Sequence, residues 1–277
     1  MIKLFNKFLF LSSVIILTSC GGSDKIDDST VVADDSNKKA VTETKLNAQN
    51  VFNSIPDRVQ ILKLIEENKI EYNGDILNNP KSYKKYTIEF YKAANLGIYG
   101  SDLSIANSFE ETQESLLFLT CVNSLASNIG VSKAFDQKMF DRMEANKSNK
   151  DSTLEIITGA FKKSDEILKN DGRAATSAVI LAGSWIEGLY IGCCFAKELG
   201  TESLIKAVLN QKESLKNLII MLEASNLDES SQFLIVDLKS LQFSYKANEK
   251  NLKYTLESIK DITDKISILS KKLITAA

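Results

Sequence analysis

The chain of 277 residues contains no histidine. This absence excludes Ser-His-Asp and Cys-His nucleophilic catalysis, histidine general bases, and the usual zinc and di-iron ligand sets. Glycine-rich phosphate loops of the Walker and dinucleotide types are also missing from the sequence. We therefore expect no catalytic residue of these kinds, no metal site and no cofactor.

Proline, cysteine and excess basic charge are scarce as well. The formal net charge is −2, whereas nucleic-acid binding needs a basic surface, so we expect no nucleic-acid partner. Four cysteines are too few for a secreted scaffold that depends on disulfides. We expect Cys121, Cys193 and Cys194 to be buried free thiols in helices, with a disulfide from Cys121 to one of the adjacent pair as the alternative.

The N-terminus has the organisation of a secretory signal peptide. Lys3 and Lys7 precede an apolar run from Phe8 to Leu17, after which small residues follow. This run is too short to span a bilayer, which takes about 20 residues. The sequence Leu17-Thr18-Ser19-Cys20 resembles the lipobox of bacterial lipoproteins. The resemblance implies that Cys20 is acylated and becomes the first residue of the mature protein.

The lipobox resemblance also implies a location in the cell envelope. Gly21 rather than aspartate follows the cysteine, which in similar Gram-negative lipoproteins favours the outer membrane. The acidic residues that come next suit a solvated tether; the alternative is a surface-export signal. We expect a signal peptide at 1–19, a lipidated flexible tether at 20–52 and an all-helical domain at 53–277, held to the membrane through the lipid on Cys20.

The remainder of the sequence predicts an all-α fold. Pro56 and Pro80, the only prolines, follow capping residues, as at the start of helices, and no segment alternates as a strand does. Nine helices are predicted, at 56–68, 80–106, 109–129, 136–146, 151–170, 173–199, 202–224, 229–248 and 251–274. We expect an antiparallel multi-helix bundle, with two four-helix halves as a weaker pattern and an α-solenoid as the alternative. In this general respect the body resembles uncharacterised all-helical lipoproteins of Gram-negative bacteria, which implies no functional residues.

The last predicted helix carries a single apolar stripe. Its members recur at spacings of three and four residues and are Leu252, Leu256, Ile259, Ile262, Ile266, Leu269 and Leu273. Because the connections between helices are short, we expect this stripe to pack within the same molecule. An intermolecular coiled coil is the alternative.

The stretch Ala178–Ala196 is apolar on all faces and contains one charged residue, Glu187. Such a segment is either a membrane span or the central helix of a globular core, and its amphipathic neighbours favour the core helix. Gly183, Gly188 and Gly192 each cost about 1 kcal/mol relative to alanine within a helix. We expect them to permit close approach of another helix or of a ligand.

Two isolated acids are the candidate functional residues. Asp102 is the only acid between residues 89 and 110, and Glu187 stands alone in its apolar helix. One hypothesis brings them together in a pocket lined also by Tyr99, Trp185 and Tyr190, which would suit a cation or a small polar ligand. The alternative is that both acids are hydrogen-bonded features of the core.

The sequence leaves three functions open. The first is a non-enzymatic envelope lipoprotein that binds another envelope protein or a small ligand. The second is a hydrolase that works with carboxylates alone, which would need an acid pair in an open cleft. The third is a structural lipoprotein that associates with itself through its last helix. No nucleophile or acid–base pair in the sequence identifies a reaction, so we expect the first.

Overall fold

The computed structural model describes residues 64–65, 67–248 and 253–275. Every regular element in this part of the chain is helical, which confirms the all-α prediction. The nine α-helices are α3 (Glu89–Ser108), α4 (Thr112–Asn128), α5 (Gln137–Ala145), α6 (Lys150–Asn170), α7 (Ala174–Leu199), α8 (Glu202–Leu209), α9 (Lys212–Ala224), α10 (Phe233–Asn248) and α11 (Leu256–Thr275). Short 3-10 turns precede or separate them, at η1 (Gly74–Ile76), η2 (Pro80–Lys85), η3 (Ser132–Ala134) and η4 (Glu229–Ser231). The predicted signal peptide and tether lie outside the described residues.

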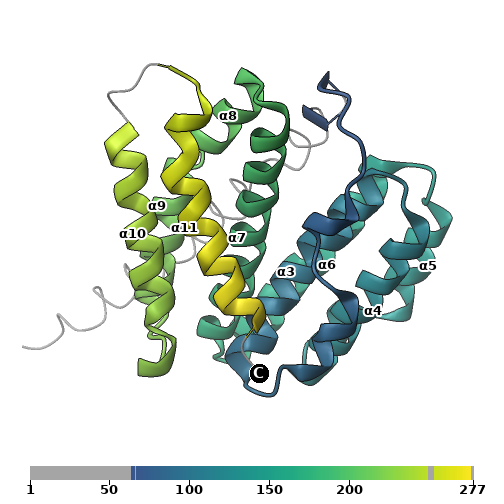
Figure 1. The fold of residues 1–277 in the computed structure, drawn as a ribbon. Helices are drawn as coiled ribbons and strands as arrows, with labels where there is room; N and C mark the ends of the chain where they lie inside the picture. The colour runs from purple at the N-terminus through teal and green to yellow at the C-terminus, as the bar shows by residue number, and fades with distance from the viewer. Residues whose placement is uncertain (1–63, 66, 249–252, 276–277) are drawn as a thin grey trace, which may run out of the picture.

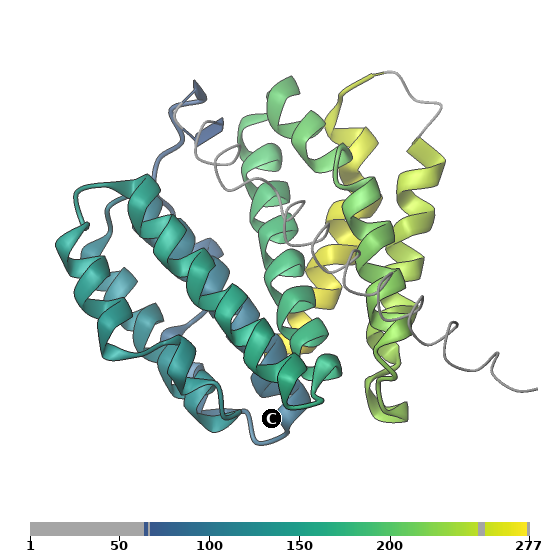
Figure 2. The same ribbon diagram turned by 180° about the vertical axis from the view of Figure 1, so that it is seen from behind.

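The helices form two groups that meet along α3 and α7. Helices α3 to α6 make up one group and α7 to α11 the other, as Figures 1 and 2 show from opposite sides. Helix α7 also packs against α6, α8, α9 and α11, and α11 returns to contact α3. In a solenoid each repeat would contact only its neighbours. The fold is therefore a bundle around a central helix.

Several predicted helix boundaries are wrong, among them the start at 229, since α10 begins at Phe233 after the 3-10 turn η4. Residues 80–85 form the 3-10 turn η2, and the backbone is extended at Tyr86 and Ile88 before α3 begins. Tyr86 is buried there and donates a hydrogen bond to the carbonyl of Ile274, which fixes this connection against α11. The predicted helix at 202–224 is two helices separated at Asn210 and Gln211, and α11 begins five residues later than expected. The count of nine is the same because the predicted helix at 56–68 lies mostly outside the described residues.

Helix α7 is the core helix that its composition predicts. Among the described residues it is the only helix long and apolar enough to cross a membrane, judged by length and composition. Yet 78% of its most apolar window is buried within the protein. Its Trp185 side chain is fully buried and donates a hydrogen bond to Ser214 of α9 at 2.9 Å. The other helices thus cover α7, as expected for a central helix.

The glycines of α3 and α7 differ in how closely other helices approach them. A Cβ atom added to Gly183 would lie 2.0 Å from the carbonyl oxygen of Ala94, and one added to Gly97 would lie 2.0 Å from that of Ile180. These two glycines therefore allow the backbones of α3 and α7 to touch, as predicted for Gly183. Gly192 differs, because a Cβ atom added there would lie 3.9 Å from its nearest neighbour, the side chain of Val208.

The apolar stripe of α11 is buried within the same molecule, which confirms the intramolecular prediction. The buried members are Ile259, Ile262, Ile266, Leu269 and Leu273. They face α7 and α10. Of the other two predicted members, Leu256, at the start of the helix, is 44% exposed, and Leu252 lies outside the described residues.

Candidate functional site

The crossing of α3 and α7 brings the two candidate acids together. Asp102 lies on α3 and Glu187 on α7, and neither side chain is exposed to solvent. Both helices are apolar around these positions, and the glycine contacts hold their backbones close. The two acids share one buried site and are not separate features of the core.

A single asparagine bridges the two carboxyl groups. The side-chain amide nitrogen of Asn78 donates to Asp102 Oδ2 at 3.0 Å and to Glu187 Oε1 at 2.9 Å. The backbone N–H of Asn78 also donates to Asp102 Oδ2, at 3.3 Å. Ser270 of α11 donates to the second oxygen of Glu187, at 3.2 Å. The pair therefore joins α3, α7, α11 and the segment that precedes η2.

This arrangement favours a pair that keeps at least one proton. Burial raises the pKa of Asp102 to about 7 despite the hydrogen bonds from Asn78, and burial together with the Asp102 charge raises the pKa of Glu187 well above its usual value. Asp102 Oδ1 is buried and has no partner among the described residues while both acids are ionised. A proton on Glu187 allows the two carboxyl groups to bond directly, because a protonated carboxyl is a donor.

The closed pair can store a proton but does not offer an open catalytic site. One oxygen of each acid accepts a hydrogen bond from the side-chain amide of Asn78, and the second oxygen of Glu187 accepts one from Ser270. A glycosidase needs room between its carboxyl groups for a sugar and, in the inverting class, a water molecule. Among the described residues, no three cysteine or acidic side chains are grouped to hold a metal ion.

Sequence reasoning missed Asn78 and Ser270. The sequence Asn78-Asn79-Pro80 was interpreted as a helix start, and Asn79 does accept a hydrogen bond from the backbone N–H of Lys81. Asn78 instead turns inward. Ser270 could have been identified from the sequence, because it is a polar residue beside Leu269 on the buried face of α11.

The three aromatic candidates make different contacts. Tyr99 donates to the carbonyl oxygen of Asn79 at 2.9 Å, next to the bridging asparagine. Trp185 points away, towards α9, through its bond to Ser214. Tyr190 is half-buried, and its pKa is raised to about 12 by burial, with smaller contributions from Cys194 and the two acids. A ligand role for these residues stays a prediction.

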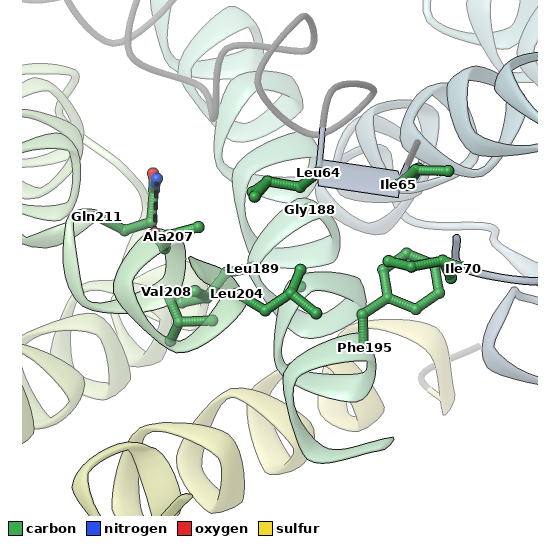
Figure 3. Close-up of a pocket in the computed structure, with 11 residues that line it drawn as sticks. Leu64, Ile65, Ile70, Gly188, Leu189, Phe195, Leu204, Ala207, Val208 and Gln211 are labelled. Carbon is green, nitrogen blue, oxygen red and sulfur yellow. Dashed lines mark hydrogen bonds between the residues drawn. The ribbon is translucent and has the colours of Figure 1, made fainter. Parts of the chain in front are cut away.

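Three of the hollows around the bundle are lined by described residues alone. The α7–α8 hollow has a volume of about 40 Å³, enough for a water molecule, and is lined by apolar side chains and by Gly188 and Gly192 (Figure 3). Gln211, also on its wall, has a buried Oε1 without a hydrogen-bond partner among the described residues. The glycines predicted to admit a helix or ligand thus border a small apolar space.

The other two hollows flank α4. One, which we call the strap hollow after the strap-like segment of residues 72–85 on its wall, has a volume of about 300 Å³. It is lined by Gly74, Asp75, Leu77, Asn78, Asn79, Pro80, Glu114, Leu117 and Phe118. The α4–α5 groove, of about 550 Å³, has Leu116, Leu119, Phe140 and Met143 among its apolar lining. Asp102 and Glu187 line none of these three hollows.

The three thiols within the described residues are free, as expected. Cys121 and Cys193 are buried and Cys194 is half-buried. Burial raises the pKa of both Cys121 and Cys193 to about 12, so these thiols stay protonated at neutral pH.

Comparison with known proteins identifies no relative of this chain. No protein-family model, curated protein or solved structure matches this chain.

Proposed function

We propose that this chain is an envelope lipoprotein, anchored through Cys20, whose helical body is a non-enzymatic binding module. The lipobox-like sequence Leu17–Cys20 supports the anchor. The lipid chains would hold the protein at the membrane, most simply the outer membrane, while residues 21–52 give the body reach. The body would then meet partners near the membrane surface.

The surface of α4 carries the binding proposal. Leu116 and Leu117 are each 52% exposed, and they lie between the two larger hollows: Leu116 borders the α4–α5 groove and Leu117 the strap hollow. Exposed apolar side chains beside hollows are typical of protein-interaction surfaces. We define the α4 surface as these two leucines with the linings of the two hollows.

The charge of the α4 surface suggests the chemistry of its partner. Its acidic side chains outnumber its basic ones. The lining contains one basic residue, Lys147, and five acidic residues, Asp75, Glu110, Glu114, Asp141 and Glu144. Glu144 pairs with Lys147 and Glu110 pairs with Lys150, and the remaining carboxylates leave the surface acidic overall. An amphipathic segment with apolar and basic side chains would complement it. A small ligand is the alternative occupant, because the volumes of both hollows fall in the range of ligand pockets.

The closure of the acid pair favours binding over hydrolysis. Asp102 and Glu187 lie behind Asn78 and are not exposed, whereas a carboxylate hydrolase would present its acids to substrate. The stripe of α11 is buried from Ile259 to Leu273, so self-association through that helix would have to use its exposed apolar side chains, Leu256 and Ile268.

Site-specific photo-crosslinking in cells tests the α4 surface. A photoreactive amino acid at Leu117 should give a discrete crosslinked protein, and the same group at Phe243 of α10 should not. Phe243 is a matched control because it is 67% exposed and lies on another helix. The double change Leu116→Ser with Glu114→Lys should remove the crosslink. Crosslinks of equal yield from both positions would contradict the proposal.

Membrane fractionation tests the anchor. The Cys20→Ala change should move the protein out of the membrane fraction, and mass spectrometry of the unaltered protein should find acyl chains on Cys20. An unmodified Cys20 in a membrane-bound protein would contradict the lipoprotein proposal.

A further inference from the structure

Residues 72–85 form a strap that runs over α3 and α4 before the first long helix begins. It is the dark blue segment in Figure 1 that descends beside these helices. Tyr99 holds it by donating to the carbonyl oxygen of Asn79, and the Cys121 thiol by donating to that of Pro80 at 3.2 Å. Both of these bonds join neutral groups, and at the other end of the strap Tyr72 donates to the half-buried carboxylate of Glu114.

The contact through Asn78 differs because its partners are buried acids. Asn78 gives the pair three hydrogen bonds, two of which end on Asp102 Oδ2. While the strap is in place, neither carboxyl group is exposed to solvent. Asn78 itself is only half-buried and borders the strap hollow. Outward movement of the strap would therefore remove the residue that separates the acids from water.

We propose that Asp102 and Glu187 form a proton-binding site that controls the strap: protons on the pair keep residues 72–85 closed over it, and proton loss opens them. Closing the strap takes two carboxyl groups out of water. Among the described residues they bond to Asn78, to Ser270 and to each other, and none of these partners is a cation. The cost of closing therefore depends on how many of the two are ionised. This inference stands whether or not the α4 surface binds a partner.

The direction of the pH effect follows from proton linkage. In the closed strap burial raises the pKa of both acids, whereas in an open strap water would return them towards the ordinary carboxyl range near 4. The closed state thus binds more protons, and acid favours it. For each proton released, opening becomes up to about tenfold more favourable per pH unit between the two pKa values.

The other titratable groups around the pair stay neutral over this pH range. Burial raises the pKa of the neighbours on every packed element, to about 12 for Tyr86, Cys121 and Tyr190. The pKa is raised likewise for Tyr72 of the strap, Tyr99 of α3 and Cys194 of α7. On α11 the facing residue is Ser270, which has no charge to change. Between about pH 5 and 8 the acid pair is therefore the titrating group at this site.

Hydrogen exchange of the full chain tests the proposal. Peptides that cover residues 72–85 would be followed at several pH values from about 5 to 8, in the unaltered protein and in Asp102→Asn. Because both proteins share the same chemical exchange rate in the strap at each pH, their ratio isolates strap opening. We expect strap exchange in the unaltered protein to rise relative to the variant by up to about tenfold per pH unit up to pH 7. The carboxamide of the variant cannot ionise, so opening of the variant should follow pH less steeply, through Glu187 alone.

Two internal checks make the result decisive. Peptides of α9 (Lys212–Ala224), which lies away from the strap, should stay better protected than strap peptides at every pH, because they exchange only when the bundle unfolds. Glu187→Gln serves as a second variant if Asp102→Asn does not fold, because its amide can donate to Asp102 as a protonated acid would. A ratio that stays constant with pH would overturn the proposal. So would equal protection of strap and α9 peptides, because it would mean that the strap opens only when the whole bundle unfolds.

Discussion

Gly183 in α7 lies directly against the backbone of Ala94 in α3. The missing side chain lets the two central helices touch at this point, and Gly97 does the same one turn along α3. This contact places Asp102 and Glu187 within reach of one asparagine. The glycine pair is therefore part of what builds the acid site.

Adding a methyl group at the helix contact should be costly. Gly183→Ala would put a Cβ 2.0 Å from the carbonyl oxygen of Ala94, so the helices must separate. We expect a loss of more than about 3 kcal/mol in the free energy of unfolding, measured in urea. Gly159→Ala in α6 is the control, because nothing lies within 4 Å of its added Cβ. That change should stabilise by about 0.5–1 kcal/mol, and similar effects from both variants would contradict the close contact.

The acid pair should make the protein less stable as pH rises. Burial raises the pKa of Asp102 from its ordinary carboxyl range to about 7, so the folded state binds more protons than the unfolded chain. The contribution of the pair to stability is therefore greatest in acid and falls as pH increases from about 4 to 7, the reverse of a salt-bridged carboxylate. Urea unfolding of Asp102→Asn should show a shallower fall, because only Glu187 then carries a raised pKa, and its stability should exceed that of the unaltered protein by a few kcal/mol at pH 8. Equal pH slopes in the two proteins would count against a buried, proton-carrying pair.

Arg173 should matter more than exposed ion pairs elsewhere. Its guanidinium donates to the carbonyl oxygen of Ile129 and pairs with Glu89, both at 2.7 Å, and so joins the starts of α7 and α3 to the end of α4. Arg173→Lys cannot make both bonds, and we expect a loss of about 1–2 kcal/mol by thermal unfolding. Lys147→Ala removes an exposed pair with Glu144 and should cost no more than about 0.5 kcal/mol.

The Arg173 contact should also weaken in acid. Hydrogen bonds from Arg173 and Thr176 hold the pKa of Glu89 below its usual value. This contribution is present at neutral pH and is lost as pH falls and the carboxylate gains a proton. The difference in melting temperature between Arg173→Lys and the unaltered protein should therefore shrink below about pH 4. A difference that grows in acid would contradict the ion pair.

Thiol labelling should follow burial. With iodoacetamide at pH 8, Cys194 should react first because it is half-buried, whereas Cys121 and Cys193 are buried and have pKa values raised to about 12. Mass spectrometry should find the latter two labelled only after denaturation. Rapid native labelling of Cys193 would mean that α7 is less well covered than its contacts indicate.

Much of the fold could be predicted from the sequence because its signals are local. The single charge of Ala178–Ala196 identifies a core helix, and the spacing of the α11 stripe identifies a buried face. The division between α8 and α9 has no such signal. Val208 and Leu215, seven residues apart and both buried, keep the apolar period running across the break.

The acid site was predictable only in part. Each acid is conspicuous in its helix, which is why Asp102 and Glu187 were candidates. Their common partner, Asn78, is separated from them by 24 and 109 residues and lies in a segment without helical periodicity. A polar residue there is equally compatible with a cap, a turn or solvent, so only the packed structure identifies its role.

The single tryptophan gives the molecule a built-in optical marker. Trp185 is fully buried and bonds to Ser214, so its fluorescence should be blue-shifted and should report on the junction of α7 and α9. This junction is on the opposite side of α7 from the strap contacts made by α3 and α4. Emission from the indole should therefore stay constant when the strap lifts and should turn red only when the bundle melts. One spectrum, recorded beside hydrogen exchange, can separate the two events without any added dye.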